Sequence, residues 1–177
     1  MAISAARRIA FHILLRVEAG AWASDLLRSA SVDLDPRDAG LASEIVFGAL
    51  RYQSQLDHLI DRPKLDPEVR IALRMGLYQL LHLDRIPPHA AVSESVELVK
   101  MARKRSAAGV VNAILRKPKR TPNVFPDQAT ALSAPAWLLA RWRHAYGETE
   151  ANLLALSFLQ PPQAYYRAGR QQDIGSQ

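Results

Sequence analysis

Apolar residues recur every three or four positions along most of the first 116 residues, which is the spacing of amphipathic helices. Ser4 has the residue type of a helix N-cap, and the apolar positions after it predict a first helix that ends at Gly20. A short helix is predicted over residues 23–30. Asp35-Pro36 then places an acidic N-cap before a proline in the first turn, and the periodicity that follows predicts one helix to about residue 61.

Asp66-Pro67 repeats the same start signal, and an apolar stripe with Gly76 at its centre follows it. A glycine in the middle of a helix costs about 1 kcal/mol relative to alanine. A close helix crossing that only a bare Cα permits would offset this cost. We therefore predict that another helix crosses at Gly76.

Pro87-Pro88 precedes a helix in which Val92, Val96 and Val99 are predicted to point inward. Its outer face is predicted to carry Ser93, Glu97, Lys100 and Lys104. Ser106 is a candidate N-cap for a further helix over residues 107–116, which Pro118 stops. Six helices with short connections, and no convincing strand, predict an all-α fold with a compact helical bundle over residues 1–117.

The remaining third of the chain has a different character. Residues 118–134 are rich in proline, threonine and asparagine and are predicted to be a linker. Residues 135–162 are predicted to form a C-terminal extension of two helices, 135–146 and 148–159, separated by Gly147. Residues 163–177 are too polar and too few to fold alone, so we expect a disordered tail.

The composition narrows the class of protein. Of the 177 residues, 49% are hydrophobic and 23% are charged, which is ordinary for a water-soluble globular chain. No run of 18 apolar residues is present, and the N-terminus continues directly into a helical pattern, so we expect no membrane span and a cytoplasmic protein. The lack of cysteine excludes disulfides, thiolate metal sites and a cysteine nucleophile.

The net charge of +6 is concentrated in one segment. Residues 1–99 sum to −2 and residues 121–177 sum to zero, whereas residues 100–120 carry eight cations and no acid. Such a patch suggests a polyanionic partner, with RNA or DNA as the first candidate. The alternative is a solvated surface with no partner.

No pattern of catalytic chemistry accompanies this patch. Neither a glycine-rich dinucleotide motif nor a phosphate-binding loop follows a strand, so no cofactor is predicted. The five histidines are scattered, and no metal site is predicted. Asp57 and Asp61 share a helix face, but exposed carboxylates on either side of His58 are more typical of a solvated surface than of acid–base catalysis. We predict no catalytic residue.

The basic run from Lys100 to Arg105 leads into the predicted N-terminus of helix 107–116, where free backbone N–H groups attract anions. Arg7-Arg8, at the start of the first helix, is a weaker signal of the same kind. The sequence therefore predicts an RNA-binding set. Its members are Arg7, Arg8, Lys100, Arg103, Lys104, Arg105, Ser106, Arg116 and Lys117.

Two stretches together resemble the signature of the NusB superfamily, AVSESVELVK at residues 91–100 and GVVNAILR at residues 109–116. That superfamily comprises bacterial antitermination factors and the N-terminal domains of ribosomal RNA cytosine-5 methyltransferases (the RsmB or Sun group). The methyltransferase branch is favoured by LRYQSQLD at 50–57, LRMGLYQLL at 73–81 and RIPPHAA at 85–91. LSAPAWLL at 132–139 resembles the join into the next methyltransferase subdomain.

The resemblance implies a NusB-like bundle that docks on ribosomal RNA during rRNA processing. The adenosylmethionine-binding domain and the cysteines of the full-length methyltransferases have no counterpart here, so we expect this chain alone to be no enzyme. A separately encoded methyltransferase domain is then a candidate partner. The alternative function is a protein-interaction module for transcription antitermination, which would act with a ribosomal-protein-like partner.

Overall fold

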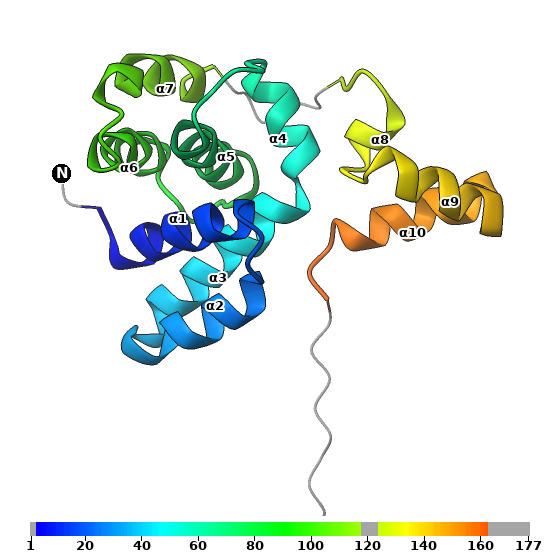
Figure 1. The fold of residues 1–177 in the computed structure, drawn as a ribbon, viewed down its shortest axis with the longest axis horizontal. Coiled ribbons are helices and arrows are strands. Elements are labelled where there is room, and N and C mark those ends of the chain that lie inside the picture. Colours follow the sequence, from blue (N-terminus) through cyan, green and yellow to red (C-terminus); the bar gives the residue numbers. More distant parts are fainter. Residues whose placement is uncertain (1–2, 118–123, 163–177) are drawn as a thin grey trace, which may run out of the picture.

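The computed structural model describes residues 3–117 and 124–162, and over these ranges the chain is helical with no strand. Figure 1 shows α1 to α7 gathered in one bundle and α8 to α10 beside it, with α4 between the two groups. The predicted all-α bundle with a C-terminal helical extension is confirmed. In the described part of the chain, no helix combines the length and the apolar character that crossing a bilayer requires.

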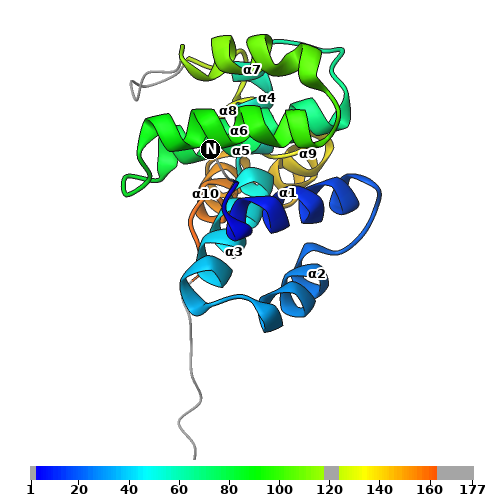
Figure 2. The same ribbon diagram turned by 90° about the vertical axis from the view of Figure 1, so that its left-hand side faces the viewer.

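Helix α5 (Pro67–His82) is the centre of the bundle because its whole circumference is covered. Every residue from Ile71 to Gln79 is buried, as expected of a helix that is surrounded by others. Five helices contact it: α1 (Ala5–Glu18), α3 (Pro36–Arg51), α4 (Gln53–Ile60), α6 (Pro88–Met101) and α7 (Ala108–Leu115). Figure 2 shows α6 and α7 stacked along one side of this core, while the short α2 (Ala23–Ala30) lies at its far edge.

The helix starts predicted at Ser4, Asp35 and Asp66 are confirmed, although only Asp35 uses its side chain as a cap. The Asp35 carboxylate accepts hydrogen bonds from the backbone N–H groups of Arg37 and Asp38, at 2.9 and 3.0 Å, and begins α3. Ser4 and Asp66 occupy N-cap positions, but neither side chain caps its own helix. Both side chains instead contact residues of other segments, which are described below.

The single helix predicted over residues 36–61 is wrong, because the chain forms two helices that meet at Tyr52. Backbone hydrogen bonding continues across the joint: the Tyr52 N–H donates to Gly48 O and the Leu56 N–H donates to Tyr52 O. The two helices also bury apolar residues toward the same core. The break between the two helices at Tyr52 therefore cannot be detected from the spacing of the apolar residues.

The crossing predicted at Gly76 is confirmed. A Cβ atom built on Gly76 would lie 2.6 Å from Cδ1 of Leu115 in α7 and 2.8 Å from Oγ of Ser95 in α6. Both distances are shorter than real carbon contacts. Helices α6 and α7 therefore approach α5 at the one place where α5 has no side chain.

The inward face predicted for α6 is only partly right. Val99 is fully buried, but Val92 and Val96 are half-buried and border a surface groove. The buried stripe contains Glu94 and Ser95 instead. The apolar pattern placed the buried stripe wrongly because it treats a carboxylate as an exposed residue. Glu94 is nevertheless buried, since it has a cationic partner inside the core.

The extension begins within the segment predicted to be a linker. Asp127 caps the short helix α8 (Gln128–Ala131), with its carboxylate 2.8 Å from the Thr130 backbone N–H. Helices α9 (Ala136–Tyr146) and α10 (Glu148–Phe158) follow, within a residue of their predicted limits. Residues 118–123 of the predicted linker and the predicted tail at 163–177 lie outside the described residues.

Helix α4 and the residue before it hold the extension against the bundle through three hydrogen bonds. The Tyr52 hydroxyl donates to Leu159 O at 2.9 Å, and the Gln55 amide donates to Ala131 O at 2.6 Å. The backbone N–H of Ser54 donates to the Ser133 hydroxyl at 3.1 Å. A second small core lies inside the extension itself and consists of Leu132, Leu139 and Ala155. The extension thus has a small core of its own, and these three hydrogen bonds join it to the bundle.

Candidate nucleic-acid interface

Residues 100–107, which we call the basic loop, comprise the last two residues of α6 and its connection to α7, and they fold as a helix C-terminal motif. The Lys104 N–H donates to Val99 O at 2.8 Å, and the Arg103 N–H donates to Lys100 O at 3.1 Å. These are the two backbone bonds of a Schellman motif, which satisfies the last carbonyl groups of α6. The motif requires a left-handed residue, and Arg103 supplies it with a φ of 62°.

An arginine in this conformation is unusual because its Cβ crowds the backbone, at a cost of about 1–2 kcal/mol relative to glycine. Glycine is the ordinary residue at this position of a Schellman motif. Arg103 therefore occupies a position at which local stability favours glycine. Such strain is a reason to look for a function of the Arg103 side chain.

The cations of the basic loop differ in how far their charge is already neutralised. Arg103 and Arg105 are exposed, and among the described residues neither has a carboxylate within ion-pair distance. Lys100 pairs with Glu97 at 2.7 Å, and this hydrogen bond holds the pKa of Glu97 below its ordinary value. The two arginines are therefore the cations available to an anionic partner.

Lys104 has a structural contact as well as a charge. Its ammonium lies 2.8 Å from Asp66 and 3.9 Å from Glu68, at the start of α5. The hydrogen bond to Asp66 raises the pKa of Lys104, so the group stays charged. Lys104 was predicted to lie on an outer face of a continuing helix. It actually ties the basic loop to α5.

The other predicted cations lie at two further places. Arg116 and Lys117 are exposed at the C-terminal end of α7, about 12 Å along the eight-residue helix from the basic loop. Arg8 is exposed near the start of α1. Ser106 was predicted to cap helix 107–116, but it lies inside a 3₁₀ turn (Arg105–Ala107), and Ala107 is the N-cap of α7. No side chain caps that helix.

Arg7 was predicted as a surface cation, and the structure corrects this because its side chain is buried. Its guanidinium donates to Glu94 Oε1 at 2.7 Å and to Gln79 Oε1 at 2.6 Å. The second oxygen of Glu94 accepts the backbone N–H and the hydroxyl of Ser4, at 2.8 and 2.9 Å. We call Ser4, Arg7, Gln79 and Glu94 the buried polar cluster.

Sequence reasoning missed Glu94 and Gln79 as partners of Arg7. The signal available was spacing, because Ala91, Glu94, Ser95 and Leu98 follow the i, i+3, i+4, i+7 rule of one buried face. A carboxylate inside such a stripe requires a cation, since an unpaired buried charge is very costly. Only the fold shows that the cation comes from the first turn of α1.

A second buried arginine, Arg74 of α5, gives Asp57 a structural role. Its guanidinium donates two hydrogen bonds of 2.7 Å to the Asp57 carboxylate and lies 3.1 Å from Glu18. Burial alone would lower the pKa of Arg74, but the hydrogen bonds and charge of Asp57 outweigh it and raise the pKa. Asp57 is therefore a partner in an ion pair that joins α4 to α5.

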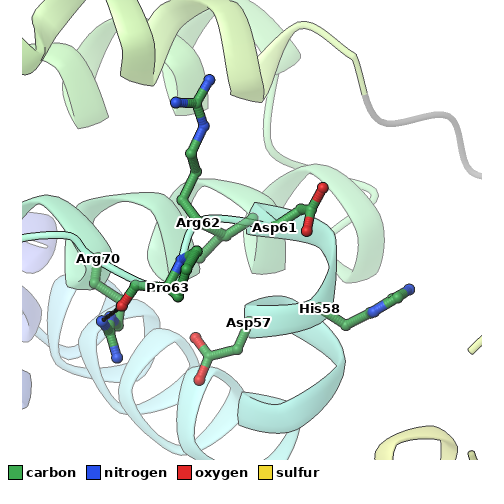
Figure 3. Close-up of a pocket in the computed structure, with 7 residues that line it drawn as sticks. Asp57, His58, Asp61, Arg62, Pro63 and Arg70 are labelled. Carbon is green, nitrogen blue, oxygen red and sulfur yellow. Dashed lines mark hydrogen bonds between the residues drawn. The ribbon is translucent and has the colours of Figure 1, made fainter. Parts of the chain in front are cut away.

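The hollow around Asp57 and Asp61 does not have the arrangement of a catalytic site. Figure 3 shows His58, Asp61 and Arg62 pointing in different directions, away from a common centre. Arg70 donates to the carbonyl oxygen of Pro63 at 3.1 Å, which fixes the loop between α4 and α5. Within residues 3–117 and 124–162, no group of three metal-ligating side chains converges.

Comparison with protein-family models matches residues 4–120 to the NusB family. The chain belongs to the NusB family. The matched range contains α1 to α7, so the NusB-type unit is the bundle, and α8 to α10 lie beyond it.

Curated relatives match more of the chain than this unit. The probable ribosomal RNA small subunit methyltransferase B of Bacillus subtilis is 33% identical over 180 residues, covering 93% of this chain and 40% of the relative. The ribosomal RNA small subunit methyltransferase B of Escherichia coli O1:K1 is 34% identical over 156 residues, covering 82% of this chain and 36% of that relative. The chain therefore spans about two fifths of the length of these relatives.

Two solved structures are similar to the bundle. One is a chain in the crystal structure of antitermination factors NusB and NusE in complex with dsRNA, with a TM-score of 0.57 and 26% identity over 63% of this chain and 90% of that one. The other is a chain in the crystal structure of a plectonemic RNA supercoil, with a TM-score of 0.58 and 25% identity. The match covers 63% of this chain and 88% of that one. This NusB-type bundle therefore belongs to a fold that has been crystallised together with RNA.

Proposed function

We propose that the chain is an RNA-binding module, which docks on ribosomal RNA through the basic loop and the cations at the end of α7. The observation that carries this proposal is the pair Arg103 and Arg105, which are exposed and have no acidic partner among the described residues. Arg116 and Lys117 extend the positive charge along α7, and Arg8 adds a cation on α1. Arg7 is left out of the interface because it is buried.

Three further observations support RNA as the polyanion. Two solved structures with a similar fold come from crystals that contain RNA, and the curated relatives are named as methyltransferases of ribosomal RNA. The separation of about 12 Å between the ends of α7 allows contacts to more than one phosphate of a strand. Phosphate contacts from arginine and lysine supply most of the affinity of such interfaces. A ribosomal RNA target would place the protein in the cytoplasm.

Replacing Arg103 by glycine is expected to separate stability from binding. Relief of the left-handed strain, reduced by the greater entropy that glycine loses on folding, should raise the free energy of unfolding by up to about 1 kcal/mol. Loss of one phosphate contact should weaken RNA binding roughly fourfold at 0.15 M salt. Denaturant unfolding and a fluorescence titration with a small-subunit rRNA fragment measure the two quantities. A variant that is more stable and binds RNA unchanged would remove Arg103 from the interface.

We also propose that catalysis belongs to a methyltransferase domain on another polypeptide segment. The extension at residues 135–162 has a surface suited to such a partner, because α10 buries its alanines and exposes large apolar side chains. The exposed large apolar residues of α10 are Leu153, Leu156 and Phe158, and Trp137 of α9 is exposed as well. Exposed apolar clusters of this kind usually mark contact surfaces.

The chain alone is expected to transfer no methyl group to RNA. It contains no cysteine for cytosine-5 chemistry, and the hollow around Asp57 lacks convergent groups. The measurement is incorporation of label from radioactive adenosylmethionine into unmodified small-subunit ribosomal RNA. Protein-dependent incorporation above the background of a heat-denatured sample would show that catalytic chemistry is present in this chain.

A second candidate is a protein-interaction module of the antitermination type, acting with a ribosomal-protein-like partner. The similarity to a chain from the complex of NusB and NusE with dsRNA favours it. The two functions differ in one measurable property. A docking module binds ribosomal RNA by itself, whereas an antitermination-type module requires its protein partner to bind RNA with comparable affinity.

A further inference from the structure

The groove between α6 and α7 is a second surface with a composition of its own. It has a volume of about 800 Å³ and runs along α6 from His89 to Lys100. Its lining between the ends is mainly aliphatic, and Ser93 and Asn112 are the uncharged polar residues there. The aliphatic residues are Leu80, Val92, Val96, Ala108 and Leu115. No aromatic side chain other than the exposed His89 lines it. Valine and leucine side chains offer no flat surface for stacking bases, which is how proteins usually hold single-stranded RNA.

The shape of the groove matches a helix. Helix α7 returns along α6 after the basic loop, so the two form an antiparallel pair (Figure 2). Residues of both helices line the groove. The distance along α6 from residue 89 to residue 100 is about 16 Å, or three helical turns. Gly109 keeps the α7 side open, because a Cβ built there meets nothing within 4 Å. A third helix can therefore lay an apolar face into this groove.

The charges at the two ends narrow the choice of partner. At one end, Lys100 and Glu97 line the groove as an ion pair, and Arg105 lines an adjoining hollow together with the same two residues. At the other end, Arg116 is exposed and has no carboxylate partner among the described residues. Each end therefore carries an excess of one positive charge. A complementary helix has acidic residues about eleven positions apart and apolar residues between them.

We propose that the α6–α7 groove is a docking site for an amphipathic helix of a protein partner, with an acidic residue at each end of its buried face. The groove includes neither Arg103 nor the exposed apolar side chains of α10. Because Arg105 and Arg116 belong to both the docking site and the proposed RNA interface, the partner helix and RNA would compete for these two cations. The occupant is a protein helix and not a nucleotide, because the lining is mainly aliphatic and the cations stand only at the ends.

The test uses a stapled 12-residue helical peptide as the probe, with leucines at positions 2, 5, 6 and 9 and glutamate at both ends. A control peptide carries lysine at both ends. Amide chemical shifts of the full chain are followed during titration with each peptide. The expected result is that shifts cluster on α6 and α7, and that the lysine-ended peptide binds at least fivefold more weakly. Shifts that map to α10, or equal affinities of the two peptides, would overturn the proposal.

Substitutions at Gly109 give the matched protein variants. Gly109→Phe places a large side chain into the groove, whereas Gly109→Ala leaves it open, and neither meets an atom of the fold at the Cβ position. The first should weaken binding of the glutamate-ended peptide at least tenfold, and the second should leave it unchanged. Both should bind RNA like the unmodified chain. If Gly109→Phe instead weakens RNA binding and leaves peptide binding intact, the groove holds nucleotides and the protein-docking proposal is wrong.

Discussion

Replacing Glu94 by alanine is expected to lower the free energy of unfolding by about 3–5 kcal/mol, because it leaves a buried arginine without a counter-charge. Arg7 is 6% exposed, and its guanidinium lies 2.7 Å from Glu94 and 2.6 Å from Gln79. The same substitution leaves the Ser4 backbone N–H without its acceptor. Urea unfolding followed by circular dichroism measures the effect.

Two controls separate this effect from a general loss of charge. Removing both charges with Arg7→Met and Glu94→Leu should recover most of the stability, since apolar residues of similar volume commonly replace a buried ion pair without loss. Glu97→Ala removes a carboxylate only three residues away, but from an exposed pair with Lys100, and should leave the unfolding midpoint nearly unchanged. If Glu94→Ala and Glu97→Ala are equally mild, Glu94 is not the buried partner that the structure describes.

Replacing Gly48 by alanine is expected to destabilise the bundle by about 3 kcal/mol, at the upper end of the effects of overpacking. A Cβ on Gly48 would lie 1.9 Å from Cζ of Tyr78, and this ring cannot move away without loss. The Tyr78 hydroxyl donates to the Glu44 carboxylate at 2.5 Å. The Tyr78 ring stacks on the His82 ring, with 5.2 Å between the ring centroids. The added methyl group must therefore displace a ring that is held by the hydrogen bond to Glu44 and by stacking on His82.

Gly40 provides the matched control on the same helix, because a Cβ there meets nothing within 4 Å. Gly40→Ala should stabilise the protein by about 0.5–1 kcal/mol through helix propensity alone. The clash also predicts coupling between Gly48 and Tyr78. In a Tyr78→Ala background, the further change Gly48→Ala should have little cost. An undiminished cost in that background would show that the tyrosine ring is not the obstacle.

The helices were predictable because apolar spacing and start signals act over a few residues. Asp35-Pro36 and Asp66-Pro67 begin α3 and α5, and Gly76 marks the crossing that its position implied. Gly48 is even more crowded than Gly76, but nothing nearby in the sequence distinguishes it from Gly40. The difference lies in Tyr78, which is thirty residues away in the chain and was brought there by folding.

The candidate interface was predictable in its charge and not in its geometry. The concentration of cations in residues 100–120 is a property of the sequence. Which of them are available depends on neighbours that local sequence does not reveal, such as Asp66 for Lys104 and Glu94 for Arg7. Paired arginines at a helix start look alike in the sequence, but Arg7 faces the core and Arg8 faces outward. Helix geometry separates them by about 100° around the axis.

The salt dependence of RNA binding by the whole chain, with and without the charges of Arg103 and Arg105, tests the central claim most directly. Each phosphate contact on a single strand contributes about −0.7 to the slope of log affinity against log salt concentration. The double variant Arg103→Gln and Arg105→Gln should therefore flatten the slope by about 1.4. The matched control is Arg28→Gln with Arg37→Gln, two exposed arginines on α2 and α3, which should leave the slope unchanged. A folded double variant with the slope of the unmodified chain would contradict the proposed interface.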